Sequence, residues 1–131
     1  MKKSGVLNHR LSHVIARMGH TQRLVVADAG LPIPPGVERI DLAVTAGLPG
    51  MTDVARAIAA ELHVEEIVVA AESVERDQSL ADELREIFPS AAFSTVPHAT
   101  FKVMSEEAVA VVRTGECVPY SNVILISGVT F

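Results

Sequence analysis

One histidine in this sequence stands where it could move a proton. His20 follows a predicted amphipathic helix and its stop at Gly19. An unperturbed imidazole has a pKa of about 6.5, so it can give or take a proton near neutrality. The alternative is a helix-terminal histidine that interacts with the last carbonyls of the helix. Position alone leaves both interpretations open.

A carboxylate stands at the end of a predicted buried strand. Asp28 closes the apolar run 24–27 and opens a loop, 29–36, that is rich in proline and glycine. In open α/β sheets, ligands bind just beyond the carboxyl ends of strands. A carboxylate there can accept hydrogen bonds from the hydroxyls of a sugar. Equally, it can cap its own loop by accepting bonds from nearby backbone amides.

Two further groups of polar residues could hold a polyol. His98 and Lys102 are four residues apart, so they share one face if the short helix predicted after Pro97 forms. Tyr120 and Asn122 supply a hydroxyl, an amide donor and an amide acceptor, with Ser121 between them. The alternatives are a solvated helical face for the first group and an ordinary turn for the second.

Two other features are not expected to carry chemistry. His9 and His13 have helical spacing, but they lack the glutamate of a zinc-protease helix and no third ligand is indicated. We expect no metal there. Cys117 is the only cysteine, which excludes an internal disulfide, and no strongly activating neighbour is evident, so it is interpreted as structural.

The elements that must position these residues alternate between helix and strand. Apolar spacing predicts helices over 7–18, 52–62, 80–88 and 98–104, with Asn8 and Thr52 as caps of the first two. Apolar and β-branched runs predict strands over 24–27, 39–44, 67–71, 91–96, 108–112 and 123–126. The fold class is therefore α/β, with three layers and helices on both faces of a mixed, mainly parallel sheet. No helix separates the last two strands, so part of the sheet is expected to be antiparallel.

Length and composition narrow the function further. The 131 residues correspond to one domain, 1–131, with a single core. A chain of this size is too small to form a deep cleft without another subunit. The net charge of −5 argues against nucleic acid as a partner. No apolar run reaches the ~20 residues of a membrane span, and no signal peptide is evident at the amino terminus. We therefore expect a cytoplasmic protein without a membrane partner.

Several spaced motifs, taken together, resemble the ribose pyranase family, to which fucose mutarotases are related. They are His20-Thr21, Val26-Ala27-Asp28-Ala29-Gly30-Leu31-Pro32-Ile33-Pro34, Gly47-Leu48-Pro49, Arg113-Thr114-Gly115-Glu116 and Pro119-Tyr120-Ser121-Asn122. The opening Lys2-Lys3-Ser4-Gly5-Val6-Leu7-Asn8 and the ending Gly128-Val129-Thr130-Phe131 also fit, so the resemblance spans the chain. Ser121 stands where the family often has alanine.

The resemblance implies an isomerase that interconverts the pyranose and furanose forms of D-ribose without metal or organic cofactor. It places the acid/base group at His20. It implies sugar-contacting positions at Asp28, His98, Lys102, Tyr120, Ser121 and Asn122. It further implies a homo-oligomer, typically a decamer of two pentamers, with sugar sites at subunit boundaries. Two alternatives stay open: a mutarotase for L-fucose or another monosaccharide, and a non-catalytic sugar-binding accessory protein of a ribose transporter.

Overall fold

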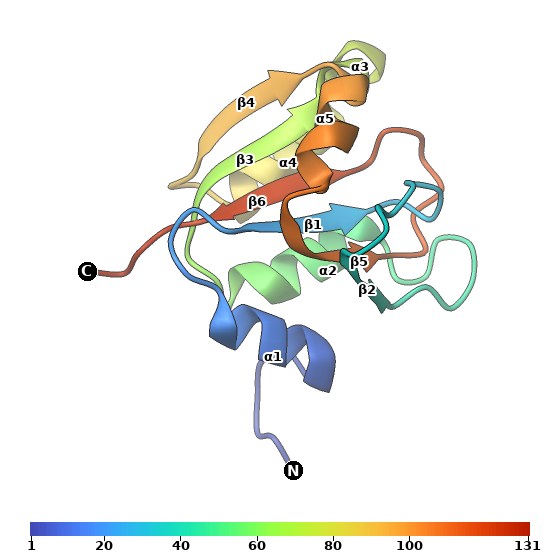
Figure 1. Cartoon of the computed structure of the whole chain (residues 1–131). Coiled ribbons are helices and arrows are strands. Elements are labelled where there is room, and N and C mark those ends of the chain that lie inside the picture. The colour runs from blue at the N-terminus through green and yellow to red at the C-terminus, as the bar shows by residue number, and fades with distance from the viewer.

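Six strands form one mixed sheet in the computed structural model, which describes residues 1–131 (Figure 1). The strands are β1 (Arg23–Ala27), β2 (Glu38–Asp41), β3 (Val64–Ala70), β4 (Ala92–Val96), β5 (Ala108–Arg113) and β6 (Val123–Ser127). Their order across the sheet is β2-β5-β1-β6-β3-β4. Only β6 runs antiparallel to its neighbours, β1 and β3, while all other adjacent pairs are parallel. The predicted mixed, mainly parallel sheet is confirmed.

Helices cover both faces of this sheet, which confirms the predicted three layers. The helices are α1 (His9–Arg17), α2 (Met51–Ala59), α3 (Ala71–Arg76), α4 (Ser79–Ile87) and α5 (His98–Ser105). Buried residues of α1, α2 and α4 share one core cluster with the sheet, and Phe101 of α5 belongs to a second cluster. In Figure 1, α5 lies in front of the sheet while α1, α2 and α4 lie on its other side. None of these helices is long and apolar enough to cross a bilayer.

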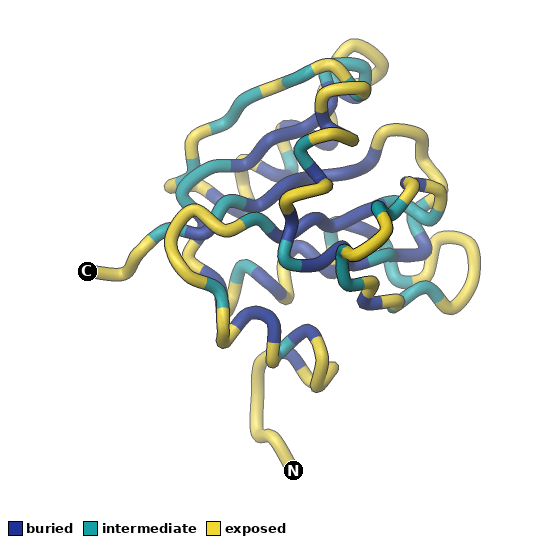
Figure 2. The backbone as a smooth tube through the Cα atoms, in the orientation of Figure 1, coloured by how far each residue is buried: buried dark blue, intermediate teal, exposed yellow.

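Alternation along the central strands divides the core between the two faces. In β1, Leu24 and Val26 belong to the larger cluster, whereas Val25 and Ala27 belong to the smaller one. Successive side chains of a strand point to opposite faces, so a fully apolar strand can support two layers at once. Figure 2 shows the consequence, with the central strands buried and the surrounding turns exposed.

The local structure differs from the sequence prediction at several places, one of which is the third strand, found at Val64–Ala70 rather than 67–71. Helix α3 was not predicted, because only Ser73 is buried along it and no apolar period marks it. Helix α2 begins at Met51 after Gly50, without a side-chain cap, so the prediction of Thr52 as its cap is wrong. The second strand ends at Asp41 rather than residue 44, because the Asp41 carboxylate accepts the Ala43 amide in a turn.

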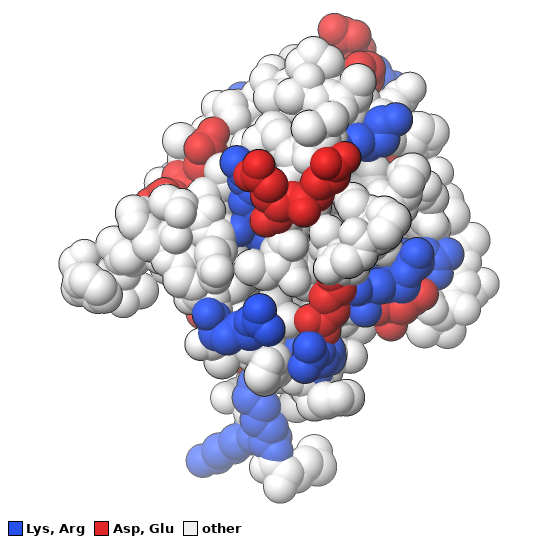
Figure 3. Space-filling view, viewed as in Figure 1, with Lys and Arg blue, Asp and Glu red and all other residues white.

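The sheet has two chemically different edges across its strand ends. At the edge we call the carboxyl edge, the five parallel strands end and β6 begins; at the opposite, amino edge, the five begin and β6 ends. The loops of the carboxyl edge lie at the right of Figure 1, and the turn before β1 lies at the left. Acidic and basic side chains are interspersed on the face shown in Figure 3, without a continuous basic stripe.

Candidate active site

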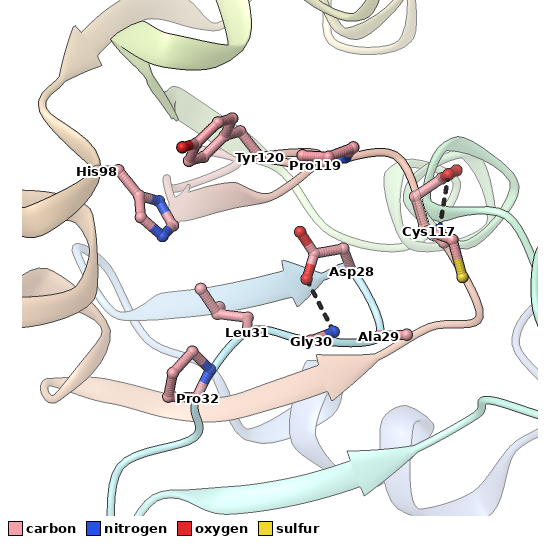
Figure 4. Close-up of a pocket in the computed structure, with 10 residues that line it drawn as sticks. Asp28, Ala29, Gly30, Leu31, Pro32, His98, Cys117, Pro119 and Tyr120 are labelled. Carbon is pink, nitrogen blue, oxygen red and sulfur yellow. Dashed lines mark hydrogen bonds between the residues drawn. The ribbon is translucent and has the colours of Figure 1, made fainter.

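An open cleft of about 570 Å³ lies at the carboxyl edge (Figure 4). Its walls are Asp28, Ala29, Gly30, Leu31, Pro32, His98, Glu116, Cys117, Pro119 and Tyr120. The cleft has the size of small-molecule sites and lies where ligands bind in open α/β sheets. Its polar groups come from the ends of β1 and β4 and from the loop before β6, which are far apart in sequence.

Asp28 is held by the chain on both sides of its carboxylate. The Gly30 amide donates to Oδ1 at 3.0 Å, and the Asn122 side chain donates to Oδ2 at 2.9 Å. The carbonyl oxygen of Asn122 in turn accepts the Asp28 amide at 2.8 Å, and Asn122 is completely buried. A carboxylate offers about four acceptor positions. Asp28 is therefore fixed in orientation and still has acceptor capacity for hydroxyls in the cleft.

The loop that carries Asp28 is bonded along its length to residues 113–116. Thr114 is buried, and both its amide and its hydroxyl donate to the Ala27 carbonyl, at 3.0 and 2.7 Å. The Ala29 amide donates to the Glu116 carbonyl at 2.7 Å, and Arg113 Nε donates to the Ala29 carbonyl at 3.0 Å. These hydrogen bonds between the two segments hold the floor of the cleft in one conformation.

A glycine allows a second loop to support this floor. The Gly115 amide donates to the Pro49 carbonyl, and the Gly47 amide donates to the Gly115 carbonyl. A Cβ at Gly115 would overlap the backbone of Thr45 and Leu48. Two motifs noted in the sequence, at 47–49 and 113–116, therefore pack against each other because residue 115 has no side chain.

Two aromatic rings close the other side of the cleft. The rings of His98 and Tyr120 meet edge to face at 5.0 Å between centroids, and Phe101 stacks beneath His98 at 6.2 Å. His98 Nδ1 is buried without a hydrogen-bond partner. The Glu72 carboxylate accepts the His98 amide and so holds the start of α5. In Figure 4, the His98 ring and the Asp28 carboxylate face the same space.

Lys102 and Ser121 do not line this cleft. The predicted helix after Pro97 is confirmed as α5, and Lys102 lies one turn beyond His98, exposed and without a polar contact in the chain. Tyr120 has a left-handed backbone, φ 62°, at the bend that precedes Ser121. Ser121 is buried and lines a separate hollow of about 300 Å³ beside the start of α2. The bend thus brings Tyr120 and Asn122, but not the Ser121 side chain, to the site.

His20 lies at the opposite, amino edge of the sheet. It precedes β1, whose five residues span about 16 Å at roughly 3.3 Å per residue, whereas Asp28 follows this strand. The nearest polar partner of His20 is Glu65, with 2.9 Å between Nε2 and Oε2. Within one chain, His20 therefore does not meet Asp28, and neither orients the other.

The sequence prediction missed most of the cleft wall. Leu31, Pro32 and Pro119 supply its apolar surface, and Glu116 buttresses the turn by accepting the amides of Cys117 and Val118. Cys117, interpreted from the sequence as structural, is exposed and lines the cleft. The proline and glycine content of 29–36 marked a rigid loop, but nothing in the pattern showed that this loop faces the residues before β6.

The fold and the cleft together define an α/β protein with an open, small-molecule-sized cleft at its carboxyl edge. A sequence model described as the RbsD / FucU transport protein family matches residues 1–130, and the chain belongs to this family. Curated relatives named D-ribose pyranase match over their full length and that of this chain. They include proteins from Coprothermobacter proteolyticus, 52% identical, and Bacillus subtilis, 44% identical.

Solved structures agree with this assignment. The Bacillus subtilis RbsD structure, complexed with D-ribose, superposes with a TM-score of 0.96 at 44% identity, and both chains are covered completely. The Streptococcus pneumoniae fucose mutarotase, in complex with L-fucose, superposes with a TM-score of 0.78 at 22% identity over 95% of each chain. At that identity, the second likeness shows a shared fold only.

Proposed function

We propose that this chain is an intramolecular isomerase that interconverts the pyranose and furanose forms of D-ribose. The observation that carries the proposal is the full-length similarity, at about half identity, to curated D-ribose pyranases. The cleft supports it, because an oriented carboxylate and an imidazole face one small, open space. Residues 1–131 act as one sugar-isomerase domain in this proposal.

The reaction requires proton transfer at two oxygens of the sugar. Opening the ring removes a proton from the anomeric hydroxyl, forms the carbonyl, breaks the bond from C1 to the ring oxygen and places a proton on that oxygen. Rotation then brings a different hydroxyl to the carbonyl, and closure reverses these transfers. General acid–base catalysis supplies roughly 100- to 10,000-fold acceleration, and the uncatalysed reaction already proceeds. One histidine with positioned hydroxyl-binding groups is therefore sufficient.

In this mechanism, the cleft holds the sugar and a histidine moves the protons. Asp28 accepts hydrogen bonds from sugar hydroxyls, while Asn122 holds the Asp28 carboxylate in its orientation. His98 and the Tyr120 hydroxyl contact the polyol from the aromatic side of the cleft. Lys102, exposed on the same helix as His98, contributes a donor at the rim. Ser121 contributes through its place in the bend, since its side chain lines another hollow.

His20 acts, in this proposal, in the cleft of a neighbouring subunit. Its place at the amino edge, about one strand length from the Asp28 of its own chain, supports this part of the proposal. The exposed apolar side chains Leu7, Val44, Leu48 and Val103, each more than half accessible, support association with further copies. We propose a homo-oligomer, a decamer of two pentamers, with sugar sites at the subunit boundaries. No cofactor is required, and a cytoplasmic location remains a prediction from the sequence.

Saturation-transfer NMR on equilibrated sugars tests the activity. With D-ribose, we expect protein to enhance exchange between pyranose and furanose signals, and His20→Ala to return this exchange to the background rate while the fold persists. Enhancement with L-fucose alone would make the chain a mutarotase instead. Absence of enhancement with either sugar, together with retained binding, would make it a sugar-binding accessory protein.

Mixing two inactive variants tests the shared site. If each site combines His20 of one subunit with Asp28 of another, random co-assembly of His20→Ala and Asp28→Ala restores about a quarter of the sites. Each variant alone stays inactive. Native mass spectrometry of the mixture, with one variant isotopically labelled, verifies that mixed oligomers form. Mixed oligomers without recovered exchange would contradict a site built by two subunits.

A further inference from the structure

A histidine–carboxylate pair lies at the amino edge, away from the cleft. His20 Nε2 and Glu65 Oε2 are 2.9 Å apart, and both side chains are substantially exposed, 51% and 39%. A carboxylate only accepts hydrogen bonds, so the pair places a proton on Nε2 of His20. In the neutral ring, Nδ1 is then the basic nitrogen, and it has no hydrogen-bond partner within the chain.

Three features of the backbone converge on this pair. Across β3 and β6, Val64 pairs with Ser127 but Glu66 pairs with Ile126, so Glu65 is the extra residue of a β-bulge. Bulges re-aim side chains and are frequent beside active sites. Thr21, next to His20, has φ 66°, which is strained for a β-branched residue. Its amide donates to the Ser127 carbonyl, which fixes the turn.

Gly128 completes the corner. A Cβ at this position would lie 3.0 Å from Glu65 Cβ and 2.7 Å from a ring carbon of His63. The chain end after β6 therefore passes directly against the bulge, held by a bond from the Gly128 amide to the His63 carbonyl. An ordinary surface ion pair needs no such construction.

We propose that Glu65 is a positioning residue for His20 in the isomerase reaction. Glu65 accepts the hydrogen bond from Nε2–H, so that Nδ1 takes the proton of the anomeric hydroxyl. The imidazolium so formed keeps its Nε2–H bond to Glu65 and then gives the Nδ1 proton to the ring oxygen. Protons balance within one turnover, and Glu65 neither takes up nor gives up a proton in the cycle. This inference rests on the proposed acid/base role of His20.

The experiment combines ring-nitrogen NMR with exchange kinetics on the assembled protein. ¹⁵N shifts of His20 report which nitrogen carries the proton. We expect the Nε2–H form to dominate in the unaltered protein and in Glu65→Gln, whose amide oxygen still accepts, and a mixture of tautomers in Glu65→Ala. Because the pair is half-exposed, its loss should have only a modest effect. We expect the turnover rate to fall about five-fold in Glu65→Ala, while KM does not change.

Glu107→Gln provides the matched control. Glu107 is also a carboxylate at the amino edge, and it is paired with Arg23 at 2.6 Å. Its loss should change neither the His20 tautomer nor turnover. Glu65→Ala should also have no further effect on exchange in a His20→Ala background, because the glutamate acts only through the histidine.

The outcomes separate this inference from the proposed function. An unchanged tautomer in Glu65→Ala overturns the positioning role, whatever the activity. An equal loss of turnover in Glu65→Ala and Glu107→Gln overturns it as well, because the loss would then come from removing any negative charge at the amino edge. Retained exchange in His20→Ala instead overturns the proposed catalytic role of His20, while the tautomer measurement still decides whether Glu65 holds the ring.

Discussion

The two edges of the sheet carry the proposed chemistry in opposite ways. At the carboxyl edge, Asp28 forms two hydrogen bonds with Asn122, a buried residue 94 positions further along the chain. The chain around Asp28 is also hydrogen-bonded to residues 113–116. At the amino edge, His20 has one partner and half its side chain is exposed. The proposed sugar-binding carboxylate is half-buried and held by a buried residue, whereas the proposed acid/base group points outward, which agrees with the proposal that it serves another subunit.

This comparison predicts that equal substitutions cost more stability at the carboxyl edge. Gly115→Ala should destabilise by about 3 kcal/mol, because the new Cβ meets backbone atoms that cannot rotate away. Gly19→Ala, at the amino edge, meets only the Gln22 side chain at 3.9 Å and should be almost neutral. Urea unfolding of both variants measures the change in unfolding free energy. Equal losses in the two variants would contradict the difference between the edges.

Asn122→Ala should produce the next largest effect. It leaves the Asp28 amide without a partner and removes the Asn122 donor from Asp28 Oδ2, so that only the Gly30 amide still holds the carboxylate. We expect a cost of about 2 kcal/mol, and exchange should fall because the carboxylate is less well oriented. His20→Ala should abolish exchange with a stability change below about 0.5 kcal/mol. Chemical denaturation and ribose NMR on both variants give the two readouts. A destabilised His20→Ala would show that the amino edge is as structural as the carboxyl edge.

Thr114→Val tests one cross-link of the cleft floor. The substitution keeps the shape but removes the hydroxyl, which donates to the Ala27 carbonyl and accepts the Glu116 amide at 3.2 Å; the Ala27 carbonyl still receives the residue 114 amide. We expect a loss of about 1 kcal/mol in unfolding free energy. Because Asp28 keeps Asn122 and Gly30, KM for ribose should change less than in Asn122→Ala. A larger KM effect in Thr114→Val would show that the hydrogen bonds of the cleft floor orient Asp28 more strongly than Asn122 does.

The smallest effect is expected at Glu61, away from the cleft. The Val6 amide, and then Lys2, hold the pKa of this carboxyl below its usual range. A lowered folded-state pKa stabilises above the unfolded-state value, and this stabilisation is lost as the pH falls through the folded-state value. Glu61→Gln should therefore lower Tm slightly at neutral pH, and the difference should vanish in acid. Glu75→Gln, whose carboxylate has no partner in the chain, is the control in thermal melts.

Local patterns predicted most of the fold. The buried strands are apolar runs whose length and β-branched content identify them, and Asn8 caps α1 through the Leu11 amide as predicted. Helix α3 was missed because six residues with one buried serine carry no periodic signal. The place of β6 between β1 and β3 could not be read from spacing, since pairing of distant strands depends on the whole sheet.

The candidate site was predicted by residue type better than by position. Asp28 followed from the rule for strand ends, and the structure adds that Asn122 is its partner. The apolar run between His20 and Asp28 marks a strand, so the sequence itself implies that the two residues lie at opposite edges; it does not show which residues each of them meets there. Glu65 was missed because a charged residue in a strand resembles an ordinary solvent-facing position, and a bulge leaves no mark in the sequence.

The place of β6 also has a consequence for how the protein is made. Strand β6 lies between β1 and β3 in the middle of the sheet, although it is the last of the six strands in sequence order. The strands on its two sides, β1 and β3, do not pair with each other. The sheet can therefore become continuous only once residues 123–127 have been synthesised and have joined it. A chain that lacks β6 would leave two open sheet edges exposed to aggregation.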